Sequence, residues 1–132
     1  MSQISELIDK LCPNGVEWKM LGEVSSIYDG THQTPKYTQT GVPFISVENI
    51  RDIYNSHKYI SREAFNAYKI KPLIGDVFLT RIGSIGDCAV FNKQEDIASY
   101  VSLALIRPKD CINSYYLKYI LESNIGKSEL RK

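Results

Sequence analysis

The side chains best suited to chemistry in this sequence lie in one polar loop and beside two apolar runs. The loop, Gly30 to Thr40, carries a histidine, two glutamines, four threonines, a lysine and a tyrosine. Similar polar groups occur in "SVENIR" and "LTRIGSIG". Amides, hydroxyls and guanidinium groups on a rigid frame can hydrogen-bond to the edges of DNA bases, while lysine, arginine and backbone N–H groups hold phosphates. These groups favour recognition of DNA, although a polar loop can equally be a solvated connection.

Signatures of catalysis and of metal binding are absent from the sequence. The patterns G-x-S-x-G, G-x-x-x-x-G-K-[ST], H-E-x-x-H and G-x-G-x-x-G do not occur. Gly83 to Gly86 lacks the third glycine of a nucleotide-binding loop and falls where two strands are expected. His32 and His57 have no cysteine nearby and no acid at a fixed spacing, and the three cysteines form no C-x-x-C. We therefore expect no catalytic residues, no metal site and no disulfide framework.

Composition predicts one cytoplasmic domain without membrane contact. A chain of 132 residues matches the usual size of one hydrophobic core, and 43% hydrophobic with 23% charged residues is typical of globular proteins. The N-terminus lacks the features of a signal peptide, and no run approaches the roughly 18 apolar residues of a membrane span. The net charge of +1 decides nothing about a polyanionic partner, but residues 51–81 carry six basic and three acidic groups. That basic middle third fits either a polyanion-facing surface or an ordinary solvated one.

Local patterns predict an α+β fold. An amphipathic helix within residues 1–14 and a last helix capped by Asn113 flank the domain, and Ser61 caps a short helix inserted between strands. Strands are expected around Trp18, over residues 25–28, 42–47, 75–83 and 101–108, and, after a hairpin turn, through Val90. This order favours a single domain with a twisted, mostly antiparallel sheet of short strands, an N-terminal helix, one inserted helix and a C-terminal helix.

Five segments of the chain, taken in order, resemble a known family. They are "VEWKMLGEV", "YDGTHQTPKY", "GVPFISVENIRD", "YISREAFNAYKIKPLIGDVFLTRIGSIGDCAVF" and "YYLKYIL". They contain, in succession, G-x-x-x-T-P, G-x-P-F-I, I-S-x-x-A, G-D-V and R-x-G-x-x-G. Over Gly15 to Ile125 this succession resembles the target-recognition domain of the DNA specificity subunit of Type I restriction-modification enzymes.

The resemblance implies sequence-specific recognition of double-stranded DNA without catalysis. Adenine methylation would belong to a partner methyltransferase subunit, which flips the base out of the duplex and uses S-adenosylmethionine. No cofactor is therefore expected on this chain, and a restriction subunit is a further expected partner.

The resemblance also assigns roles to individual residues. The candidate DNA-contacting residues are Thr31, His32, Gln33, Thr34, Lys36, Tyr37, Asn49, Arg51, Lys69, Lys71, Arg81, Ser84 and Tyr100. In the loop, Gly30 would permit a turn and Pro35 would limit flexibility. Arg81 has three alternatives: a bidentate contact to guanine, a phosphate contact, or a pairing with an acid inside the fold.

The sequence departs from the family in two places. The family has two recognition domains joined by long spacer helices, whereas this chain ends at "GKSELRK". We therefore expect a helix over 1–14, the recognition domain proper over 15–125 and the start of a spacer helix over 126–132. The chain would be a half-subunit, a truncated product or an excised domain, completed by a second copy or a second specificity half. Ser99-Tyr100 stands where many relatives have Asn-Gln, so a role for Tyr100 is less firmly implied.

Two other classes of function stay open. One is a protein interaction module, such as an antagonist that docks on a DNA methyltransferase. The other is a small enzyme whose site is assembled from scattered residues.

Overall fold

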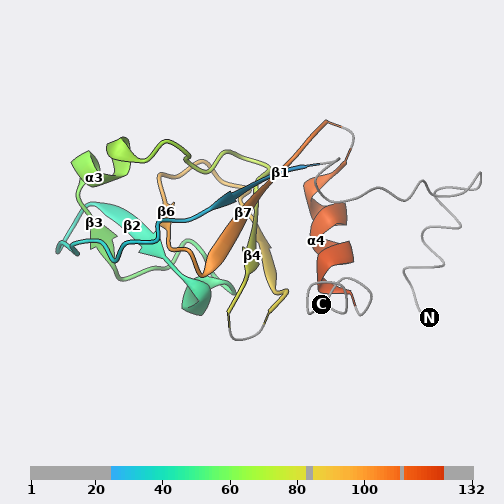
Figure 1. The fold of residues 1–132 in the computed structure, drawn as a ribbon, viewed down its shortest axis with the longest axis horizontal. Helices are drawn as coiled ribbons and strands as arrows, with labels where there is room; N and C mark the ends of the chain where they lie inside the picture. The colour runs from blue at the N-terminus through green and yellow to red at the C-terminus, as the bar shows by residue number, and fades with distance from the viewer. Residues whose placement is uncertain (1–24, 83–84, 111, 124–132) are drawn as a thin grey trace, which may run out of the picture.

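Two small β-sheets form the frame of the computed structural model, which describes residues 25–82, 85–110 and 112–123 (Figure 1). The elements are β1 Ser25–Asp29, β2 Val42–Ile45, the 3-10 helix η1 Val47–Asn49, β3 Tyr59–Ile60, α3 Arg62–Ala67, β4 Val77–Thr80, β5 Cys88–Val90, β6 Ala98–Ser99, β7 Leu103–Pro108 and α4 Ser114–Glu122. In Figure 1, α4 lies beside the sheet that contains β1, β4 and β7, and α3 lies beside the smaller sheet at the other end. The predicted α+β class is confirmed.

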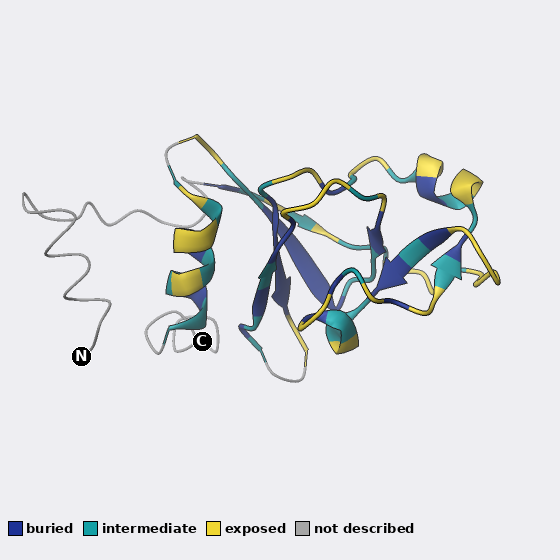
Figure 2. Cartoon of the chain, turned by 180° about the vertical axis from the view of Figure 1, so that it is seen from behind, coloured by how far each residue is buried: buried dark blue, intermediate teal, exposed yellow. Residues whose placement is uncertain are grey.

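The larger sheet has the order β1-β7-β4-β5, and all its neighbouring strands are antiparallel. Because side chains alternate between the faces of a strand, β4 sends Val77 and Leu79 to one face and Phe78 to the other. Val77 and Leu79 pack with Leu117 and Leu121 of α4. Figure 2 accordingly shows the strands mostly buried and much of the outer face of α4 exposed.

The smaller sheet has the order β3-β2-β6, with β2 antiparallel to β3 and parallel to β6. Helix α3 packs against it through Phe65, which is 4% exposed. A third group of buried side chains, including Ile45 and Phe78, lies between the two sheets. The sheets therefore share one apolar layer, and the predicted mostly antiparallel pairing is confirmed, with β2 and β6 as the one parallel pair among the described strands.

Local capping chemistry sets several helix ends as the sequence predicts. The side chain of Ser61 accepts a hydrogen bond from the Ala64 N–H at 3.1 Å, and the Asn113 side chain accepts from Tyr115 N–H at 2.9 Å. Such side-chain acceptors satisfy N–H groups that the first helical turn leaves without partners.

Three of the predicted strands, over 42–47, 75–83 and 101–108, are longer than the observed ones, whereas the strand predicted over 25–28 extends to Asp29. The predicted strand over 42–47 ends at Ile45, because the next residues turn into η1. The predicted strand over 75–83 begins only at Val77, because Gly75 has a φ of +101° and lies in a turn. The predicted helix at 1–14, the strand around Trp18 and residues 126–132 lie outside the described residues, and the domain boundaries stay predictions. Within the described ranges, no helix is long and apolar enough to cross a membrane.

Candidate nucleic-acid interface

The polar loop begins with a close backbone crossing at Gly30. A β-carbon at this position would lie 2.3 Å from the carbonyl oxygen of Tyr100, well inside contact distance. Gly30 does not have a positive φ, so the expectation that it permits a turn needs correction. Glycine is required here because the two backbones approach so closely.

Backbone hydrogen bonds tether the loop at both ends. The Thr31 N–H donates to the Ser99 carbonyl at 3.0 Å, and the Thr38 N–H donates to the Tyr59 carbonyl at 2.8 Å. The first tether joins the loop to β6 and the second joins it to β3. We call residues 32–36, which lie between these two tethers, the arch. His32, Gln33, Thr34 and Lys36 of the arch are exposed, and Pro35 is half-buried.

Thr31 also shapes the arch through its side chain. Its Oγ1 accepts a hydrogen bond from the Gln33 N–H at 3.3 Å. Such a local side-chain bond favours a turn over extended backbone. The arch is therefore a short, tethered segment with its polar side chains outward, which is the arrangement that base readout requires.

An ion pair lies at the base of the arch, where β1 and β4 end. Arg81 directly follows β4, and its Nη1 donates to Oδ1 of Asp29, the last residue of β1. The second carboxylate oxygen of Asp29 lies 3.7 Å from Nε2 of His32. The side chains of Arg81 and Asp29 are 44% and 47% exposed, so the pair is at the surface and not inside the fold. Arg81 therefore pairs with an acid at the surface, and not inside the fold as the third alternative has it, and its contact with a base or a phosphate stays a prediction.

Tyr37 is held against the smaller sheet. Its ring meets that of Phe44 edge-on at 5.9 Å, and Nζ of Lys58 lies 5.6 Å from the centre of the Tyr37 ring. Lys58 also pairs with Glu48 at 3.1 Å, and the hydrogen bond to Glu48 raises the pKa of Lys58. Tyr37 thus anchors the far end of the loop while half of its surface stays open to a ligand.

Three further candidate residues are engaged within the chain. Oδ1 of Asn49 accepts from the Ser46 N–H at 3.0 Å, which stabilises η1. Nζ of Lys71 donates to the carbonyl of Tyr68 at 2.6 Å, at the C-terminal end of α3. The ring of Tyr100 packs on a phenylalanine of β2 with 6.3 Å between ring centres. Their contacts with DNA stay predictions, and Ser84 lies outside the described residues.

Lys69 and the start of the loop line opposite sides of a small cavity of about 240 Å³. The cavity is lined by Lys69 and Phe65 from the α3 side and by Asp29, Gly30 and Thr31 from the loop side. Lys69 is exposed, and no hydrogen bond or ion pair of its side chain is found among the described residues. Its ammonium group is therefore available at the same end of the molecule as the arch.

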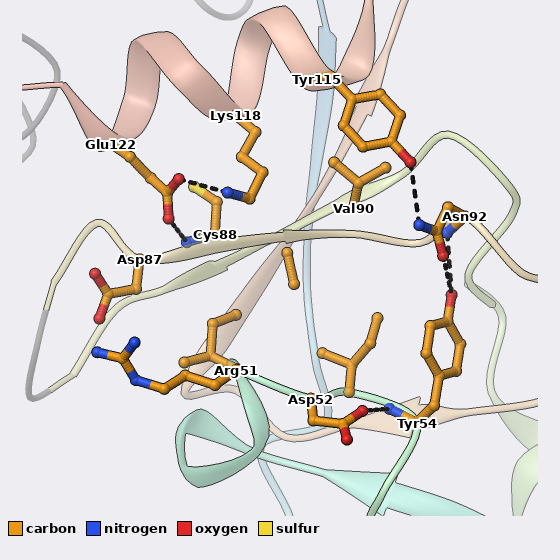
Figure 3. A pocket seen from close by; sticks show the side chains of 13 residues that line it. Arg51, Asp52, Tyr54, Asp87, Cys88, Val90, Asn92, Tyr115, Lys118 and Glu122 are labelled. Atoms are coloured by element: carbon orange, nitrogen blue, oxygen red, sulfur yellow. Dashed lines mark hydrogen bonds and ion pairs between the residues drawn. The ribbon is translucent and has the colours of Figure 1, made fainter.

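Arg51 lies apart from the arch, in a wider pocket of about 510 Å³ (Figure 3). The pocket is formed by residues 50–54, by β5 and by α4, with Arg51 on the side opposite α4. Across it, Lys118 pairs with Glu122 at 2.6 Å, and Glu122 accepts the Cys88 N–H at 3.1 Å. These contacts connect α4 to β5, so most polar groups here serve the fold.

A second chain of hydrogen bonds closes the other end of this pocket. The Tyr54 hydroxyl accepts the Asn92 N–H at 3.0 Å, and the Asn92 side chain donates to the Tyr115 hydroxyl at 3.0 Å. Figure 3 shows this series running from residues 50–54 to α4. Among the described residues, no group of three or more histidine, cysteine or acidic side chains could hold a metal ion.

An ion pair with a buried carboxylate lies at the start of β4 and was not predicted from the sequence. Arg107 donates through Nε and Nη2 to the two carboxylate oxygens of Asp76, each at 2.9 Å. The Leu73 N–H donates to the same carboxylate at 2.8 Å, and Arg107 also reaches the Lys71 carbonyl at 2.8 Å. The hydrogen bond to Asp76 raises the pKa of Arg107. The sequence feature that could have indicated this ion pair is the acid in the G-D-V motif of residues 75–77, which lies between a glycine and an apolar run.

Comparison with known proteins finds likeness in structure. No protein-family model and no curated protein matches the sequence. The HsdS subunit from Thermoanaerobacter tengcongensis matches with a TM-score of 0.69 and 26% identity over 88% of this chain and 29% of that chain. A chain from a structure of complex assembly and conformational transition in the type I R-M system matches with a TM-score of 0.63 and 23% identity, over 96% of this chain and 36% of that chain. This chain thus spans about a third of the chains that it matches, and the expected resemblance to the specificity subunit is confirmed.

Proposed function

We propose that this chain recognises a specific sequence in double-stranded DNA, as a target-recognition domain of a Type I restriction-modification specificity subunit. The observation that carries the proposal is the likeness to an HsdS subunit over 88% of the chain. The tethered arch agrees with it, because it presents amide, hydroxyl, imidazole and ammonium groups from a fixed frame.

The arch and Arg81 would read bases, while the lysines nearby would hold phosphates. Amide and hydroxyl groups of Gln33 and Thr34 suit base edges, and the guanidinium of the half-exposed Arg81 suits guanine. Lys36 and Lys69 are exposed cations beside these groups, as phosphate contacts that set the register should be.

The chemical steps would take place on other subunits. A methyltransferase subunit would bind S-adenosylmethionine and modify an adenine, and a restriction subunit would cut, so this chain would carry no cofactor. Since one domain would read one half of a split target, a second specificity half or a second copy would complete the site. The assembly would act in the cytoplasm.

Binding titrations test the DNA-recognition step. Purified chain is titrated with mixed-sequence duplexes at several salt concentrations, and log K should fall with log salt at about 0.9 per phosphate neutralised. A flat salt response would exclude the proposal, and binding to a methyltransferase without binding to DNA would favour an antagonist.

Methylome sequencing tests the biological role. Cells that contain the methyltransferase partner are compared with and without this chain, and removal of the chain should abolish methylation at one defined motif. Methyl transfer by the purified chain alone, at a rate that follows the protein through purification, would show instead that it is an enzyme.

A further inference from the structure

An acidic residue stands where the proposed function requires DNA to approach. Asp29 is half-exposed at the end of β1, and each of its carboxylate oxygens faces one basic side chain, Arg81 or His32. A carboxylate repels phosphates, so phosphate binding gives no reason for its presence. An exposed ion pair also contributes little to stability. The position of Asp29 therefore needs another explanation.

The sheet fixes the backbones on both sides of this ion pair. Asp29 is paired in register with Ala104 of β7, and the Arg81 N–H donates to the Ser102 carbonyl at 2.9 Å. Both residues are thus bound to the same short stretch at the start of β7. Strands β1 and β4 lie on either side of β7 in the sheet, and side chains held by one sheet can keep a defined geometry, which flexible loops cannot do.

We infer that Asp29 is a positioning residue that orients Arg81 for contact with a guanine, an inference that rests on the proposed function. Arginine has five N–H donors, and the bond from Nη1 to Asp29 is the one hydrogen bond of this half-exposed side chain found among the described residues, so the donors of Nε and Nη2 are not engaged there. Two of these donors match the O6 and N7 acceptors of guanine. By restricting the rotamers of Arg81 before binding, Asp29 reduces the conformational entropy lost on contact.

The test uses the full chain and duplexes selected from a random pool by the unaltered protein. Binding to the selected duplex and to a scrambled one is measured for Asp29→Asn, Arg81→Ala and the double variant, together with thermal stability. For Asp29→Asn we expect the preference for the selected duplex to fall about tenfold, at one base pair, while scrambled DNA binds equally well or slightly better. In the Arg81→Ala background, Asp29→Asn should cause no further loss of preference. Asp96→Asn removes another ion-paired aspartate of the same exposed fraction, 47%, and serves as the control.

Each other outcome overturns the inference. Tighter binding to both duplexes with the preference unchanged would mean that Asp29 merely repels DNA. A further loss of preference in the double variant would mean that Asp29 reads a base itself, and a lower melting temperature with equal losses on both duplexes would mean that it supports the fold. If the unaltered chain shows no salt-dependent binding to any duplex, the proposed function fails, whereas retained preference in Asp29→Asn removes only the role of Asp29.

Discussion

Two aspartate–arginine pairs lie at opposite ends of β4 and differ in their surroundings. Asp76 and Arg107, at the start of β4, form a pair in which the Asp76 side chain is 2% exposed. We call this the frame pair. Asp29 and Arg81, at the end of β4, form a pair in which both side chains are nearly half exposed, and we call this the surface pair. The same chemistry therefore stabilises the fold at one end and is accessible to a ligand at the other.

The frame pair should give the largest effect on stability. Asp76→Asn leaves the guanidinium of Arg107 without its anion, and breaking a buried pair costs about 3 kcal/mol or more of the free energy of unfolding. Urea-induced unfolding measures this. Asp96→Asn, which removes the exposed partner of Arg62, is the control and should cost less than about 1 kcal/mol. Similar losses in both variants would show that burial does not distinguish the two kinds of pair.

The crossing at Gly30 should give the next largest effect. Gly30→Ala places a methyl group against the Tyr100 carbonyl and forces the backbones apart, at a cost of about 1–3 kcal/mol in unfolding free energy. DNA binding should weaken as well, because the arch loses its first tether. Thr34→Ala, at an exposed arch position, should stay within about 0.5 kcal/mol. An unchanged unfolding midpoint for Gly30→Ala would contradict the close approach.

Breaking the surface pair should affect DNA binding more than stability, whereas breaking the frame pair should mainly affect stability. Arg81→Ala should change the unfolding free energy by less than about 1 kcal/mol. On the selected duplex it should cost about 1–3 kcal/mol of binding free energy, and far less on scrambled DNA. Titrations with both duplexes check this, and equal losses on both would assign Arg81 to a phosphate.

Lys69 and Lys71 should show the same contrast between DNA binding and stability, with smaller effects. Lys69→Ala should weaken binding to all sequences alike and reduce the salt slope by about 1, with stability unchanged. Lys71→Ala should instead lower the unfolding free energy by about 0.3–1 kcal/mol, because the ammonium group of Lys71 satisfies a carbonyl at the end of α3. A smaller salt slope for Lys71→Ala with normal stability would show that both lysines face DNA.

Local sequence signals predicted local structure well. The capping roles of Ser61 and Asn113 were predictable because each side chain bonds to N–H groups two or three residues further on. The parallel pairing of β2 with β6 was not, because Phe44 and Ala98 are far apart in the sequence and β6 is only two residues long. Short strands leave too little alternation to detect.

The sequence predicted which residues belong to the candidate site, but not which partners they contact in the fold. The arch residues were found because amides and hydroxyls gather there in the sequence. The partner of Arg81 lies 52 residues away, and nothing in either segment specifies the other. Asn49 and Lys71 look like surface donors in the sequence, and only the folded backbone supplies their partners.

The hydrogen bonds of Glu122 and Tyr54 also bear on how the protein behaves at high concentration. Strand β5 is at the edge of its sheet, and such an edge can recruit a strand from another molecule and start aggregation. Here the outward N–H groups of Cys88 and Asn92 already donate to those two side chains. A strand from a neighbouring molecule would first have to displace both side chains, which hinders pairing along this edge.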